Sequence, residues 1–412
     1  MISNVQNINI AEYDYPLPDE RIAKYPLAER DASKLLVMKD SKIFQNQFKN
    51  IGDYLPEKSV LIFNETKVVR ARLQFVKDSG AAIEIFCLEP ITGNGDYQLA
   101  FSAGSPVEWH CLVGNSRRWK DTGNGPSIRM PLNIKGKDVV LYAERIEKND
   151  AYSVIRFSWE PAEISFAEVL ENAGEIPLPP YLHREAEPSD RDRYQTVFAK
   201  YEGSVAAPTA SLHLTKPLIA KLKEQGHSIE EVTLHVGAGT FRPVATDTIG
   251  EHEMHSESII VKKKCIENLS DNIGRTIIPV GTTSMRTIES VYWIGVMLLE
   301  QGFEERNLHV NQWFPYQDRE KLPSAKESLE AILKYLEMHH LDALHATTAL
   351  MIAPSCPIML TKALITNFHQ PKSTLLLLVS ALIGDKWKEA YRFALEHDFR
   401  FLSYGDSCLF IP

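Results

Sequence analysis

Cysteine is scarce in this sequence and is never grouped. Five cysteines are spread over 412 residues, and no CxxC pair or CxxxCxxC triad occurs. The first absence excludes a zinc ribbon of ordinary spacing, and the second excludes an iron–sulfur cluster whose ligands are encoded side by side. We expect reduced thiols that pack as small, partly buried side chains, at Cys87, Cys111, Cys265, Cys356 and Cys408.

Long apolar segments are also missing. The longest, Leu375 to Ile383, is interrupted by Ser380 and is too short to span a bilayer. The first residues do not combine a basic segment with an apolar one, so they do not resemble a signal peptide. We therefore expect a soluble, cytoplasmic protein without a membrane partner.

An excess of basic charge is absent too, because the net charge is −9. This balance argues against a general nucleic-acid binder, whose affinity comes largely from Lys and Arg. An acidic protein can still act on RNA when its basic residues share one face. Arg70, Arg72, the run at 117–120 and Lys372 are candidates, although short runs are equally typical of a solvated surface.

The length of the chain exceeds one typical core, which predicts two domains. Residues 67–154 hold strand-like runs between Gly- and Asn-rich turns, typical of a small antiparallel β-barrel. The flanking residues alternate strands, such as 59–63, with helices, such as 161–172. We predict a mixed α/β fold, with a main domain of residues 1–66 and 155–412 and an inserted β-barrel domain at 67–154.

Four segments combine glycine or hydroxyl residues with a His, Arg or Lys: 203–215, 233–244, 280–290 and 366–374. Small residues let a backbone approach a ligand closely. Three of the segments, 233–244, 280–290 and 366–374, lie where predicted strands run into loops, and α/β proteins bind ligands at the carboxyl ends of strands. The four segments therefore predict one polar site assembled from distant loops.

Each segment also has a structural interpretation. His213 suits proton transfer near neutral pH, but it also fits a core strand between Leu212 and Leu214. The glycines and arginine of 237–242 fit either an anion site or a tight turn. The hydroxyls of 282–284 cap a helix as readily as they bind an anion.

The sequence His252-Glu253-Met254-His255 superficially suggests zinc. Its spacing is HExH rather than HExxH, so the two histidines do not lie one helical turn apart. We expect no metal there. Shaping the pocket or ordinary surface placement remain as the two alternatives.

In their order and amino-acid sequence, the four segments resemble the S-adenosylmethionine:tRNA ribosyltransferase-isomerase family of queuosine biosynthesis. The resemblance extends to 13–23, 63–73 and 401–407, and so covers most of the chain. Departures occur at Ser211 and Leu214, where the family has a glycine and an aromatic residue. Further departures are Gln370, in place of an apolar residue, and 352–357, in place of an aromatic-glycine turn.

This resemblance implies transfer and isomerisation of the ribosyl part of S-adenosylmethionine onto 7-aminomethyl-7-deazaguanine at the wobble position of a tRNA with a GUN anticodon. The product is epoxyqueuosine, and adenine and methionine leave. The sulfonium acidifies the ribose C5′ protons, so a positioned base makes an ylide without a metal or other cofactor. We expect a monomer.

The reaction that the resemblance implies needs a base, an acid for the departing adenine and a group that binds the methionine carboxylate. His213 or His235 is the candidate base, His369 is the second proton-transfer residue, and Arg242 or Arg286 binds the methionine carboxylate. We expect His213, His235, Thr283 and His369 to line a common cavity. The substrate-binding candidates are Thr209, Thr215, Gly237, Gly239, Arg242, Thr282, Thr283, Ser284, Arg286, Asn367, Lys372, Ser373 and Thr374.

Two other functions are weighed against this one. An S-adenosylmethionine-dependent tRNA methyltransferase would have a glycine-rich loop after its first strand, and the GAGT sequence of 237–240 lacks that context. A non-catalytic tRNA-binding protein would fit the acidic charge poorly.

Overall fold

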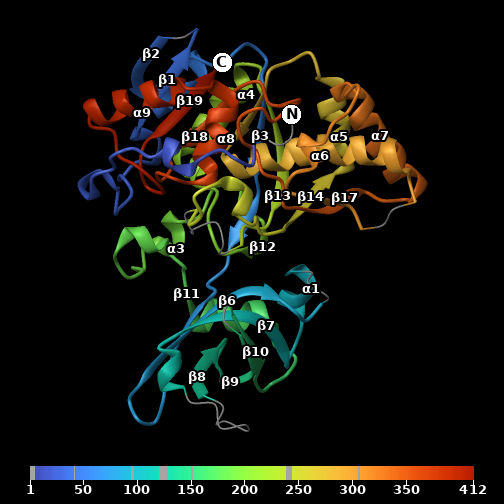
Figure 1. The fold of residues 1–412 in the computed structure, drawn as a ribbon. Coiled ribbons are helices and arrows are strands. Elements are labelled where there is room, and N and C mark those ends of the chain that lie inside the picture. Colours follow the sequence, from blue (N-terminus) through green and yellow to red (C-terminus); the bar gives the residue numbers. More distant parts are fainter. Residues whose placement is uncertain are drawn as a thin grey trace.

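The computed structural model describes residues 5–40, 42–93, 97–119, 128–149, 152–237, 244–304 and 307–412. These residues form a 10-stranded sheet, a 7-stranded sheet and a two-stranded pair of β4 (Thr66–Val68) and β12 (Tyr201–Ser204). Figure 1 shows the larger sheet with its helices at one end of the molecule and the smaller sheet at the other. The predicted mixed α/β class is confirmed.

The larger sheet mixes parallel and antiparallel pairs. In spatial order its strands are β16 (His309–Val310), β17 (Ala343–Thr348), β14 (Glu257–Lys262), β13 (Ser228–Leu234), β3 (Val60–Asn64), β15 (Ile277–Val280), β18 (Leu364–Asn367), β19 (Ser407–Ile411), β1 (Lys34–Lys39) and β2 (Lys42–Gln47). The central strands β13, β3, β15 and β18 run parallel. Their carboxyl ends therefore meet at one edge.

Strand β3 explains why this sheet is buried on both faces. Val60 and Ile62 enter one hydrophobic core, and Leu61 and Phe63 enter another. Successive side chains of a strand point to opposite faces, so an unbroken apolar run fits a strand covered on both sides. The strand predicted at 59–63 is confirmed.

Helices pack on both faces of the larger sheet. They are α4 (Lys216–Glu224), α5 (Lys263–Asp271), α6 (Thr282–Gln301), α7 (Ala325–Met338), α8 (Thr374–Ile383) and α9 (Lys386–Glu396), and the short α3 (Asp190–Arg193) lies outside them. Helix α6 begins directly after β15, with Gly281 as its N-cap. The helix predicted from 161 begins instead at Phe166 as α2 (Phe166–Ala173), because Ser165 and Glu168 form a capping box there.

The smaller sheet is antiparallel and has its own hydrophobic core. Its strands, in spatial order, are β11 (Gly174–Glu175), β5 (Arg72–Val76), β6 (Ala82–Pro90), β7 (Val107–Gly114), β10 (Ser153–Ser158), β9 (Lys137–Lys148) and β8 (Ile128–Ile134), and α1 (Tyr97–Ser102) packs beside them. The sheet curls, but no described residues of its edge strands β11 and β8 pair, so it is a half-barrel and not a closed barrel.

This sheet continues past the predicted boundary at residue 154, which falls inside β10. Helix α2 and strand β11 also belong to it. The division of the chain into two domains stays a prediction.

All five cysteines are buried and none forms a disulfide. Within the described ranges, no helix combines the length and apolar character that crossing a membrane requires.

Candidate active site

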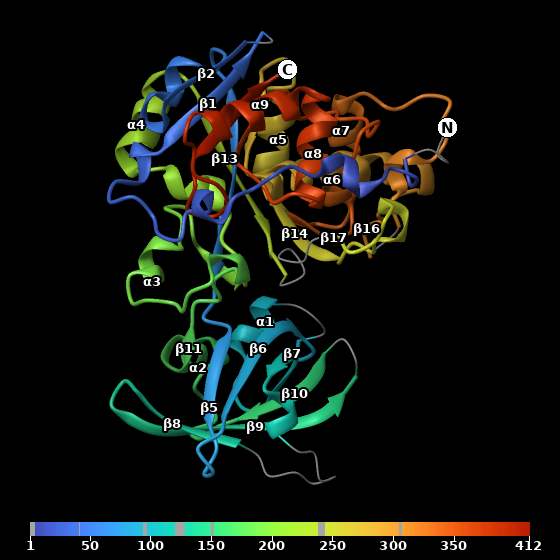
Figure 2. The same cartoon turned by 60° about the vertical axis from the view of Figure 1, so that its left-hand side comes forward.

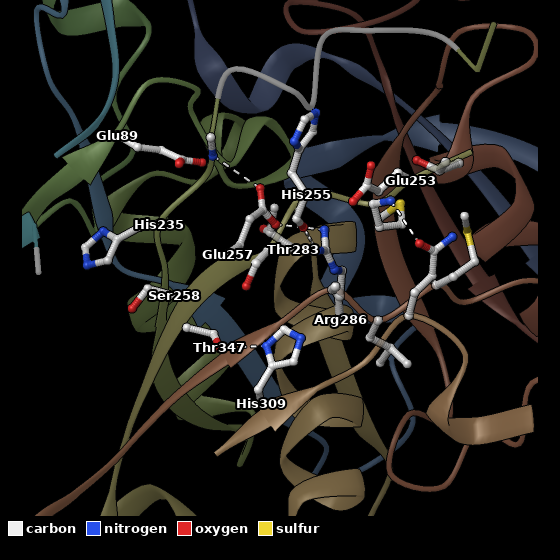
Figure 3. Close-up of a pocket in the computed structure, with 18 of the residues that line it drawn as sticks. Glu89, His235, Glu253, His255, Glu257, Ser258, Thr283, Arg286, His309 and Thr347 are labelled. Carbon is white, nitrogen blue, oxygen red and sulfur yellow. Dashed lines mark hydrogen bonds and ion pairs between the residues drawn. The ribbon is translucent and has the colours of Figure 1, made fainter. Parts of the chain in front are cut away.

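A cavity of about 780 Å³ lies where the carboxyl edge of the larger sheet faces the smaller sheet. Figure 2 shows α1 and β6 below the ends of β14 and β17, and Figure 3 shows the side chains at close range. The part of the molecule around the larger sheet, including α6 and α8, supplies His235, Gly237, Thr282, Thr283, Arg286 and Thr374. The part around the smaller sheet, including α1, supplies Glu89, Tyr97, His110 and Tyr152. A cavity thus lies at the ends of the strands, where the site was predicted, and its use as the site stays a prediction.

His235, directly after β13, is held on both sides of its ring. The Tyr97 ring stacks on it at 5.1 Å between centroids and 26° between planes. On another side Gly203 approaches so closely that an added Cβ would overlap the imidazole. Because Tyr97 comes from α1, this contact joins the smaller sheet to the larger one. Burial and the carboxylates of Glu89 and Glu257 raise the pKa of Tyr97, so its phenol stays neutral.

Arg286 is already engaged within the protein. Its Nη1 lies 2.7 Å from Oε2 of Glu257, and its Nη2 donates to the carbonyls of His255 and Thr348. Glu257 in turn accepts a hydrogen bond from the N–H of Gly237 at 3.2 Å. The ion pair therefore ties α6 to the loop after β13 and to β17. It leaves Arg286 poorly placed to bind a methionine carboxylate with two hydrogen bonds, the role predicted for Arg242 or Arg286.

A second cavity, of about 100 Å³, adjoins the first and shares Thr282, Thr283 and Thr374 with it. These residues begin helices α6 and α8, so both helix N-termini face the junction of the cavities. The Oγ1 of Thr283 is buried and makes no hydrogen bond to any part of the chain that the structure describes. Backbone N–H groups and a free hydroxyl at two helix N-termini suit an oxygen-rich ligand.

His369 lines this second cavity and not the first. Its Nε2 lies 2.9 Å from Oγ1 of Thr366, and burial lowers the pKa of the imidazole to about 3. The ring is therefore neutral near pH 7 and serves poorly as a proton donor in this state. Thr209, Asn367, Ser373 and Thr374 line the same cavity. Ser373 also caps α8 by accepting from the N–H of Leu376.

His213 lies against a third, much smaller cavity. Its Nδ1 is 2.8 Å from Oγ of Ser33, and its Nε2 is 2.9 Å from Oδ1 of Asn367. Burial lowers the pKa of His213. The expectation that His213, His235, Thr283 and His369 line one common cavity is therefore wrong, since they line three neighbouring ones. His213 instead fixes Asn367, which reaches the second.

Three predicted residues lie away from these cavities. Thr215 caps α4 and donates to Asp31. Ser284 is buried and donates to the carbonyl of Val280. Lys372 forms an ion pair with Asp14 at 2.9 Å. Gly239 and Arg242 fall outside the described residues, so the structure does not place them.

Several residues that line the large cavity were not predicted. Glu257 and His309 lie on strands of the larger sheet, and Glu89, Tyr97 and His110 belong to the smaller one. Within a strand or a short helix these residues carry no local sequence signal. His252 and His255 do line the cavity, which confirms the pocket-shaping alternative for that motif. No three residues among the described ones are arranged to hold a metal ion.

A family model described as "Queuosine biosynthesis protein" matches residues 10–410. The chain belongs to this family. Curated relatives named S-adenosylmethionine:tRNA ribosyltransferase-isomerase include those of Syntrophotalea carbinolica, 36% identical over 98% of this chain and 100% of the relative, and Aquifex aeolicus, 35% identical over the same shares. A crystal structure of S-adenosylmethionine tRNA ribosyltransferase from Thermotoga maritima is 27% identical, covers 97% of this chain and 99% of that one, and has a TM-score of 0.45. The predicted family is confirmed.

We predict that Gly203→Ala displaces the ring of His235, because the added methyl group has no room beside it. Activity should fall by roughly 100-fold if a displacement on the order of 1 Å is enough to misplace a reacting group. Turnover and thermal unfolding of the variant measure the two effects. Gly274→Ala is the matched control, since an added Cβ there meets no atom within 4 Å and Gly274 lines none of the three cavities.

We predict that His369 makes the fold sensitive to acid. Its pKa is about 3 when folded against 6.5 for a free histidine, so the unfolded chain binds the proton first and stability is lost as the pH falls below about 6.5. The loss reaches about 3 kcal/mol at about pH 4. Urea unfolding of wild type and His369→Gln at about pH 7 and pH 4 measures it. An equal loss in both proteins would contradict the prediction.

Proposed function

We propose that this protein transfers and isomerises the ribosyl group of S-adenosylmethionine onto 7-aminomethyl-7-deazaguanine at the wobble position of tRNA, giving epoxyqueuosine with release of adenine and methionine. The full-length match to the queuosine family supports this reaction. The observation that carries it is the cavity of about 780 Å³ between two sheets. Such a volume accommodates a nucleoside donor and a base turned out of the RNA stack.

The donor's sulfonium charge acidifies the neighbouring ribose C5′ protons, so the first step needs a positioned base. Of the three candidate histidines, only His235 lines the large cavity. Its ring is fixed by Tyr97 and Gly203, which suits a general base that must face one substrate atom. We assign His235 as the base and His213 as a positioning residue.

The helix N-termini at the cavity junction suit the oxygen atoms of the donor. Thr282, Thr283 and Thr374 lie at the starts of α6 and α8, where N–H groups are not used within the helix. Ribose hydroxyls and the methionine carboxylate both accept hydrogen bonds from such groups. This placement gives the carboxylate binding groups other than Arg286.

Further features belong to the same proposal. The acceptor is a tRNA with a GUN anticodon, the reaction uses no metal or other cofactor, and the protein acts as a cytoplasmic monomer. The smaller sheet with its own core forms an inserted domain, close to the predicted 67–154 but continuing to Glu175.

Incubation with S-adenosylmethionine and a tRNA carrying 7-aminomethyl-7-deazaguanine tests the reaction. Chromatography should detect free adenine and methionine in equal amounts. S-adenosylhomocysteine would indicate a methyltransferase instead, and the absence of any product would favour a non-catalytic tRNA-binding protein.

We predict that His235→Gln lowers kcat by roughly 100- to 10,000-fold, because removal of a general base typically has an effect of that size. Adenine release under saturating substrates measures it. The control is His345→Gln, which changes an exposed histidine of β17 that does not line the cavity. Near-normal turnover in His235→Gln would refute the role of this histidine.

We predict that Thr283→Val raises the KM for S-adenosylmethionine by roughly tenfold, the value of one hydrogen bond of about 1.4 kcal/mol. Thermal stability should not fall, since the hydroxyl has no hydrogen bond within the described chain to lose. Thr283→Ser keeps the hydroxyl and should keep the wild-type KM. A loss of stability without a change in KM would show a structural role.

A further inference from the structure

One face of the smaller sheet carries three side chains that the reaction described above does not use. Glu89 on β6 is the cross-strand partner of His110 on β7. The His110 ring lies 4.1 Å from the ring of Tyr152, between centroids. All three residues line the large cavity. They therefore form one continuous patch on the wall that faces the donor-binding loops.

The local geometry of β6 sets the direction in which the Glu89 side chain points. Pairing between β6 and β7 shifts register between Cys87 and Glu89, as at a β-bulge or a similar irregularity. A bulge bends a strand and redirects the side chain beside it, and bulges are common next to active sites. In Figure 3 the Glu89 carboxylate points toward the side of the pocket where Glu257 lies.

The charge of Glu89 distinguishes it from the other carboxylate nearby. Glu257 is neutralised by Arg286 at 2.7 Å. Glu89 is exposed and forms neither an ion pair nor a hydrogen bond with any residue in the described ranges. A carboxylate without a cationic partner in the described part of the chain, beside two flat rings, is suited to a flat ligand with a cationic arm.

We propose that Glu89, His110 and Tyr152 form the subsite for the acceptor nucleobase. The base stacks on the His110–Tyr152 pair, and the carboxylate of Glu89 accepts a hydrogen bond from the protonated aminomethyl arm. This inference rests on the proposed function. It places the acceptor on the wall of the smaller sheet and the donor on the wall of the larger one, so that the amine faces the sugar.

Binding of two tRNAs to the intact protein tests the subsite. One carries 7-aminomethyl-7-deazaguanine at the wobble position, and the other carries guanine, which lacks the cationic arm. Wild type should bind the first about tenfold more tightly, as one charge-assisted hydrogen bond allows. Glu89→Gln should abolish this preference and leave the affinity for S-adenosylmethionine unchanged. Glu147→Gln, an exposed carboxylate of β9 outside the cavity, is the matched control and should retain it.

Two further variants separate stacking from charge. Tyr152→Ala should weaken the binding of both tRNAs by roughly tenfold, because stacking does not depend on the arm. Glu253→Gln removes another carboxylate that lines the cavity, away from the ring pair, and should keep the preference.

The outcomes are distinguishable. Retention of the preference in Glu89→Gln, or its loss in Glu253→Gln instead, would overturn this subsite while adenine release by wild type still supports the proposed function. Absence of adenine release by wild type would overturn the proposed function and this inference with it.

Discussion

The site depends on one constraint, the parallel alignment of β13, β15 and β18 around β3. Because parallel strands end at the same edge of a sheet, residues from 235, 282 and 367 onward meet although they are far apart in sequence. Strand β15 leads directly into α6 and β18 leads through the loop 368–373 into α8, and the N-termini of both helices face the same space. The concentration of N–H groups and hydroxyls at the cavity junction follows from this topology, without any dedicated binding motif.

The Arg286–Glu257 ion pair holds the elements around the cavity together. Both side chains are largely buried, so losing either partner would leave the other charge without compensation at a cost of several kcal/mol. The pair connects α6 to β14 and, through the carbonyl of Thr348, to β17. It therefore fixes the position of the cavity wall relative to the helix N-terminus. An arginine in the first turn of a helix opposes the helix dipole, and here a structural partner accounts for it.

The sequence predicted the strands and the edge of the sheet where the cavity lies better than it predicted which side chains line that cavity. The apolar run at 59–63 and the glycine- and hydroxyl-rich loops identify strands and the edge that binds ligands, because these signals are local. Burial is not local. The sequence around His213, His235 and His369 does not reveal that the first and third lie outside the large cavity, since their surroundings include distant residues such as Ser33 and Tyr391. Glu89 and His110 were missed because alternation within a strand looks the same on a cavity wall as on any other surface.

The two walls of the cavity belong to two separate hydrophobic cores. Substitutions on the exposed face of the smaller sheet, at Glu89 or Tyr152, do not disturb the packing that holds β13, β15 and β18 in place. Tyr97 couples the two walls, because its half-buried ring stacks on His235. A change in the smaller sheet that moved α1 would reach the candidate base through this ring contact and through β12, which α1 also contacts and which carries Gly203. Within the described chain, the proposed acceptor subsite and the candidate base are thus linked through α1, by way of Tyr97 and of β12.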